Sequence, residues 1–156
     1  MKKLVLTALA TITWTQGVAF GYDPSVAAAL QSFYGKLDFD KLATSNLFIK
    51  ADELAMRLKN GEAITMVDIR TPQEQAFIKV GYPSTLSAPL TEVFTPKVLD
   101  MIPVDQPVVI VCHSGTRATP VVMNLRMLGF KNVQALEGGI VALAQVSAPK
   151  SCPTKK

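Results

Sequence analysis

The chain has 156 residues, of which 49% are hydrophobic and 18% are charged, and its formal net charge is +4. This length favours a single domain, and the apolar share is ample for a buried core. The net charge, to which Lys2 and Lys3 contribute, is too small to indicate a nucleic-acid partner.

The first 19 residues have the parts of a secretory signal peptide. Lys2 and Lys3 precede an apolar stretch at 4–14, and Gly17-Val18-Ala19 offers a cleavage site, with a second one after Gly21. The apolar stretch is too short to span a bilayer. We therefore expect a periplasmic or secreted protein that has no membrane attachment after cleavage. The alternative is an uncleaved N-terminal anchor.

Residues 20–45 are expected to form an N-terminal extension with a short helix over 26–34, which Asp23 can cap and Pro24 can begin. From residue 46 to residue 147, apolar runs alternate with helical patterns. Strands are expected at 47–50, 64–69, 86–88, 107–111 and 133–136, and helices at 51–59, 72–77, 96–101, 118–128 and 140–146.

This alternation predicts an α/β fold. Because the strands are continuous apolar runs and do not alternate with polar residues, we expect a central, mostly parallel sheet flanked by helices on both faces. Residues 148–156 are expected to be a flexible polar tail. The tail contains Cys152, which we interpret as a free thiol. A disulfide with Cys112 is the alternative in an oxidising compartment.

The segment that says most about function is Cys112-His113-Ser114-Gly115-Thr116-Arg117, which joins the strand at 107–111 to the helix at 118–128. In such a loop the backbone amides and the helix N-terminus direct positive charge at one spot. A thiol held there ionises readily, and Arg117 adds a permanent cation. The pattern predicts a nucleophilic cysteine that handles a small anion. The alternative, a small buried hydrophobe, suits Ile110 or Val111 better than Cys112.

Four segments of the chain, taken together and in order, resemble those of a single-domain rhodanese, which is a sulfurtransferase. They are Val67 to Pro72 with Glu74, Ala88-Pro89-Leu90, the loop from Cys112 to Arg117, and Leu136 to Ile140. The resemblance covers about residues 46–147. It departs from the family at Val80-Gly81-Tyr82, where a Gly-His pair is usual and the resemblance implies an insertion of two residues. An aromatic residue usual after the Gly-Gly turn is also missing.

The resemblance implies that Cys112 accepts a sulfane sulfur from thiosulfate or a related donor, becomes a persulfide, and passes the sulfur to a thiophilic acceptor. Arg117 would bind the sulfonate end of thiosulfate, and His113 would either favour the thiolate or be an ordinary polar residue. Ser114 and Thr116 would act through their amides, and Gly115 through its backbone freedom. No cofactor or metal is expected. The partners would be a small sulfur anion and a possible protein sulfur acceptor.

Asp68 and Arg70 should lie at the end of a neighbouring strand, where open α/β sheets place their ligands. Either residue would brace the loop or complete the pocket. The alternative is a structural ion pair, formed with each other or with Glu74.

Two other functions use a similar cysteine. Cysteine phosphatases and arsenate reductases have five residues between Cys and Arg, whereas four lie between Cys112 and Arg117. The shorter loop makes a smaller cradle, which suits one sulfur better than a tetrahedral oxyanion. A non-enzymatic persulfide carrier or binding module, which hands its sulfur to a dedicated partner, stays open.

Overall fold

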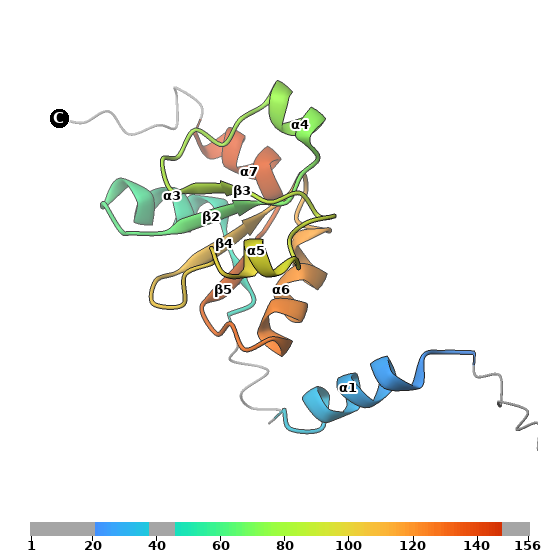
Figure 1. The fold of residues 1–156 in the computed structure, drawn as a ribbon. Coiled ribbons are helices and arrows are strands. Elements are labelled where there is room, and N and C mark those ends of the chain that lie inside the picture. The colour runs from blue at the N-terminus through green and yellow to red at the C-terminus, as the bar shows by residue number, and fades with distance from the viewer. Residues whose placement is uncertain (1–20, 38–45, 148–156) are drawn as a thin grey trace, which may run out of the picture. The chain divides into compact units, whose positions relative to one another are not determined.

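The computed structural model describes residues 21–37 and 46–147 (Figure 1). The chain divides into two compact units between residues 38 and 39. In the first unit, helix α1 (Pro24–Tyr34) begins as predicted, because the Asp23 carboxylate accepts hydrogen bonds from the amides of Ser25 and Val26. The predicted signal peptide, residues 38–45, and the tail with Cys152 lie outside the described residues.

The second unit contains one five-stranded sheet in the order β1-β5-β4-β2-β3, and every pair of neighbours in it is parallel. This confirms the predicted α/β fold. The central strand β4 is buried along its whole length, which explains why its sequence is an uninterrupted apolar run. The strands are β1 (Phe48–Ile49), β2 (Thr65–Asp68), β3 (Thr85–Ser87), β4 (Val108–Val111) and β5 (Val133–Leu136).

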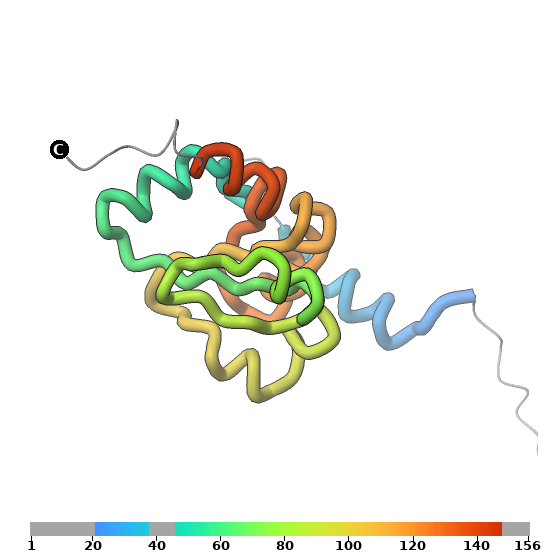
Figure 2. Tube along the Cα trace, turned by 90° about the horizontal axis from the view of Figure 1, so that it is seen from above, coloured from blue at the N-terminus to red at the C-terminus, as the bar shows by residue number. Residues whose placement is uncertain are grey.

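Helices cover both faces of the sheet, as Figures 1 and 2 show. On one face, α3 and α7 pack together through a core that includes Leu54 and Ile140. On the other face, α5 and α6 contribute Val98 and Leu125 to a second core. The helices of this unit are α3 (Ala51–Lys59), α4 (Pro72–Phe77), α5 (Pro96–Leu99), α6 (Ala118–Met127) and α7 (Gly139–Val146).

The predicted boundaries differ from the observed ones by at most two residues. The strand expected at 64–69 pairs only over Thr65–Asp68, and the helix expected at 96–101 ends at Leu99. Pro103 explains the second difference, because a helix usually ends before the residue that precedes a proline. Within the described residues, no helix is both long and apolar enough to cross a membrane.

Candidate active site

Cys112 directly follows β4, at the edge of the sheet where the carboxyl ends of the strands meet. β4 lies between β5 and β2, and the register pairs Val111 with Asp68, so both strand ends reach the same edge. Cys112 has no measurable exposure and belongs to the core on the α6 face. The strand thus delivers the thiol to the base of the loop, beneath the exposed residues that follow it.

The loop folds back so that a backbone amide points at the sulfur. Gly115 N donates a hydrogen bond to Cys112 Sγ over 3.1 Å. Gly115 has a φ of +93°, a conformation that L side chains rarely adopt. Its carbonyl accepts hydrogen bonds from the amide and the hydroxyl of Thr119, which ties the loop to the first turn of α6. This arrangement directs the positive end of an amide dipole at Sγ, as the sequence predicted.

The start of α7 supports the loop from the other side. The amide of Ile140 donates to the carbonyl of Cys112 over 2.8 Å, and the amide of Val141 donates to the carbonyl of His113 over 3.3 Å. The first amides of a helix lack partners within the helix, so the loop satisfies them. Gly139 has a φ of +58°, and a Cβ there would lie 2.5 Å from both loop carbonyl oxygens. The Gly-Gly turn therefore lets α7 approach the backbone of Cys112 itself.

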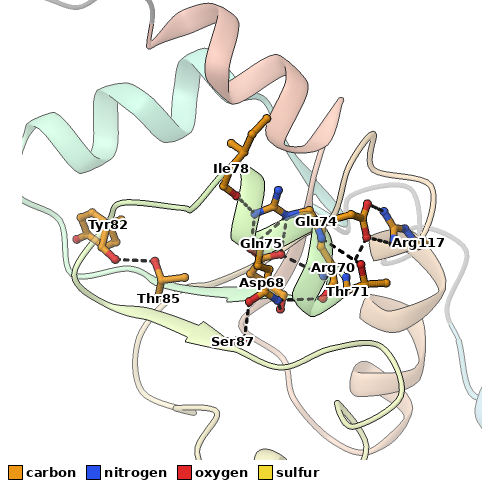
Figure 3. A network of polar contacts seen from close by, with 10 residues as sticks. All are labelled: Asp68, Arg70, Thr71, Glu74, Gln75, Ile78, Tyr82, Thr85, Ser87 and Arg117. Carbon is orange, nitrogen blue, oxygen red and sulfur yellow. Dashed lines mark hydrogen bonds and ion pairs between the residues drawn. The ribbon is translucent and has the colours of Figure 1, made fainter.

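Arg117 forms a two-pronged ion pair with Glu74 of α4 (Figure 3). The two guanidinium nitrogens lie 2.9 and 2.6 Å from the two carboxylate oxygens. The hydrogen bond from Arg117, followed by one from the backbone amide of Thr71, lowers the pKa of Glu74 from 4.5 to about 2. The same pair raises the pKa of Arg117, and the nearby Cys112 thiol raises it further. The guanidinium therefore interacts with both the Glu74 carboxylate and the Cys112 sulfur.

Glu74 is fixed in place by the start of its helix. The Thr71 hydroxyl accepts from the Glu74 amide, and the Thr71 amide donates to the Glu74 carboxylate over 2.9 Å, which together form a capping box. The sequence did not predict the ion pair between Glu74 and Arg117. The Thr71-x-x-Glu74 spacing was the available signal, since it predicts an N-terminal cap, but it says nothing of a residue 43 positions away.

Asp68 and Arg70 pair with each other, which is the structural alternative considered above. Their side chains are 4% and 2% exposed, and Arg70 Nη2 lies 2.6 Å from Asp68 Oδ2. Arg70 also donates to the carbonyl of Ile78 over 2.7 Å, and the Gln75 amide donates to the backbone carbonyls of both paired residues. Removing one partner from such a buried pair costs about 3–5 kcal/mol. The pair thus anchors α4, the helix that carries Glu74.

The remaining predicted loop residues lie at the surface. The side chains of His113, Ser114 and Thr116 are exposed, and the hydroxyls of Ser114 and Thr116 lie 3.2 Å apart. Beside the buried ion pair, a cavity of about 500 Å³ lies between α4 and β3 and is bordered by Asp68 and Ser87. In residues 21–37 and 46–147, no group of three or more His, Cys, Asp or Glu side chains could hold a metal ion.

The parallel sheet, with a cysteine loop at the carboxyl end of its central strand, defines an α/β domain in which a backbone amide points at a buried thiol. The family model described as rhodanese-like domain matches residues 50–145. The chain belongs to the rhodanese-like family. The match agrees with the domain resemblance drawn from the sequence over about 46–147.

Individual relatives give the same result. A sulfurtransferase of Allochromatium vinosum is 36% identical over 105 residues, which cover 67% of this chain and 94% of the relative. A rhodanese-related protein of Thermoplasma volcanium superposes with a TM-score of 0.54 at 27% identity, over 65% of this chain and 93% of that one. A rhodanese-like domain protein of Staphylococcus aureus gives a TM-score of 0.54 at 31% identity, over 62% and 89% of the two chains.

Proposed function

We propose that this protein is a sulfurtransferase that carries a sulfane sulfur as a persulfide on Cys112. The observation that carries the proposal is the Gly115 amide directed at Cys112 Sγ, with the Arg117 cation beside the same sulfur. An anionic sulfur is stabilised by both groups. The similarity to a sulfurtransferase of A. vinosum supports the same chemistry.

The proposed reaction has two steps. The Cys112 thiolate attacks the outer sulfur of thiosulfate or a related donor, and the sulfur–sulfur bond of the donor breaks with its electron pair leaving on sulfite. The outer sulfur of the resulting persulfide carries the negative charge beside the loop amides. A thiophilic acceptor, such as cyanide or a protein thiolate, then attacks this sulfur, and the Cys112 thiolate is restored.

The size of the loop supports sulfur transfer over phosphoryl or arsenate chemistry. The loop already closes tightly: Gly115 N reaches Sγ over 3.1 Å, and a Cβ on Gly115 would lie 3.1 Å from the Leu136 carbonyl oxygen. One added sulfur atom needs less room than a tetrahedral oxyanion. The donor must approach from the exposed side formed by His113, Ser114 and Thr116, since the thiol itself is buried.

The test is intact-mass measurement of the protein before and after thiosulfate treatment. We expect a gain of one sulfur on Cys112, followed by release of thiocyanate when cyanide is added. Loading without steady thiocyanate production would instead support the persulfide carrier. Failure to gain sulfur from thiosulfate and from an organic persulfide would overturn both forms of the proposal.

We also propose that the protein is exported and acts in the periplasm or outside the cell. The proposal rests on the basic, apolar and small-residue parts of residues 1–19. A thiol working in such a compartment is exposed to oxidation, and a pairing of Cys112 with Cys152 would silence it.

A further inference from the structure

Arg117 is the one permanent cation of the loop from Cys112 to Arg117, and it is bound at both ends of its guanidinium by Glu74. Two of its five N–H donors point at this carboxylate, with 2.9 and 2.6 Å between the atoms. The Cys112 thiol interacts with the same guanidinium and contributes to its raised pKa. The positive charge beside the nucleophile is therefore opposed by a negative charge in direct contact with it.

We propose that Glu74 is a specificity-determining residue, which disfavours a dianionic donor such as thiosulfate relative to an organic hydropersulfide, which carries at most one negative charge and no sulfonate. The inference rests on the proposed function, and it names the class of donor that this site uses best. Glu74 acts through Arg117: a dianion must either share the guanidinium with the carboxylate or displace the carboxylate, whereas a donor of lower charge without a sulfonate needs neither.

The carboxylate cannot easily move aside. Its Oε2 accepts from the Thr71 amide over 2.9 Å as well as from Arg117, so a rotation of the side chain breaks the capping box together with the ion pair. The helix beneath it is held by the buried pair of Asp68 and Arg70. The ion pair is about one-third exposed on each side, so it borders the solvent from which a donor arrives.

Both donors leave the same protein product. With thiosulfate, the Cys112 thiolate forms a bond to the outer sulfur, and sulfite departs with the electron pair of the broken sulfur–sulfur bond. With an organic hydropersulfide, the thiolate forms the same bond, the proton stays on the transferred sulfur, and an organic thiolate departs. The two reactions differ chiefly in the charge that the donor brings into the site. The ratio of their two rate constants therefore reports how far Glu74 offsets the positive charge of Arg117.

The experiment compares single-turnover loading of Cys112 by thiosulfate and by the hydropersulfide of 2-mercaptoethanol, in the full chain and in Glu74→Gln. Gln keeps the oxygen that the capping box requires, so α4 keeps its start while the charge is lost. We expect the rate constant for thiosulfate to rise about three- to fivefold, which corresponds to the upper range of a partly exposed ion pair. The rate constant for the hydropersulfide should change by less than about twofold.

The matched control is Glu62→Gln. Glu62 forms the same kind of two-pronged pair with Arg57, but it precedes β2 and so lies at the opposite edge of the sheet. The Glu62→Gln variant should leave the ratio of the thiosulfate and hydropersulfide rate constants unchanged. In an Arg117→Gln background, Glu74→Gln should no longer raise the thiosulfate rate, because the proposed effect passes through Arg117.

Each outcome decides a separate point. If both donors load Cys112 but Glu74→Gln leaves their ratio unchanged, or if the ratio shifts equally in the Arg117→Gln background, the specificity role is wrong and the proposed function stands. If neither donor loads Cys112 in the unmodified chain, the proposed function itself is overturned. Circular dichroism of each variant shows whether it retains the fold.

Discussion

The amide of Ile140 donates a hydrogen bond to the carbonyl of Cys112 over 2.8 Å, which joins the first turn of α7 to the backbone of the loop cysteine. The contact depends on Gly139, whose position admits no Cβ. The loop is thus shaped from two directions: Gly115 turns its amide toward the sulfur, and α7 holds the carbonyl side of the same residue.

Gly139→Ala should destabilise the domain by about 2–4 kcal/mol, because the new Cβ would lie 2.5 Å from two backbone oxygens that cannot move independently. Gly61→Ala is the control. Gly61 also has a positive φ, of +80°, but a Cβ there meets nothing within 4 Å, so we expect a loss of only about 1 kcal/mol. Urea unfolding measures both. Equal losses in the two variants would show that the close approach of α7 is unimportant.

Cys112→Ser should abolish sulfur loading and leave the fold intact. Serine is similar in size and can still accept from the Gly115 amide, but its hydroxyl does not form a persulfide. Intact mass after thiosulfate treatment and circular dichroism are the two measurements. Sulfur gained by Cys112→Ser would contradict the assignment of Cys112 as the nucleophile. The control variant Cys152→Ser should keep the sulfur-transfer activity. Peptide mapping without reductant reports any Cys112–Cys152 disulfide.

Arg117→Ala should lower kcat/KM for thiosulfate about tenfold or more while costing only about 1 kcal/mol of stability. The loss of rate follows because the variant removes the cation that interacts with the sulfur. The small loss of stability follows because the pair is partly exposed and screened by solvent. Steady-state kinetics and thermal melting separate the two effects. An unchanged kcat/KM would remove Arg117 from the site.

The stabilising contribution of Glu74 should depend on pH in a defined window. Its pKa in the folded protein, about 2, lies below the ordinary value of 4.5. The folded state therefore binds fewer protons between these values, and the contribution is fully present above about pH 4.5 and is lost as the pH falls toward 2. The difference in melting temperature between the unmodified protein and Glu74→Gln should shrink over this range. A constant difference would show that the carboxylate does not titrate with the pair.

The export proposal can be checked by fluorescence. Trp14 is the only tryptophan of the chain and lies in the predicted signal peptide, so cleavage after Ala19 or Gly21 removes it. Protein purified from its native compartment should then show emission from tyrosine alone. Tryptophan emission, or an N-terminal sequence that begins at Met1, would show that the segment is retained as an anchor.

Local patterns predicted most of the fold. The apolar run at 108–111 is a strand because β4 is buried on both faces, and the helix start at Asp23-Pro24 follows from capping chemistry. The ends of short strands could not be predicted, since pairing stops one residue before burial does: Ile64 and Ile69 are buried but lie outside β2.

The loop that forms the site could be predicted from the sequence, but the residues from other elements that contact the loop could not. The spacing of Cys112, Gly115 and Arg117 identified the segment, because all three lie within one short stretch of chain. The pair of Glu74 and Arg117 joins α4 to the loop across 43 positions, and the chain between them can place either residue in many ways. The close approach of Gly139 likewise depends on how α7 packs, which no local pattern records.

The dependence of the loop on α7 also sets when the site can form. A growing chain that has not yet reached residue 139 contains Cys112, but it lacks the glycine and the helix amides that hold the Cys112 and His113 carbonyls. Chains are made from the amino end, so this support arrives among the last segments. In a partly made chain Cys112 therefore lacks this support, and the loop that we propose activates its thiol forms only when the domain is almost complete.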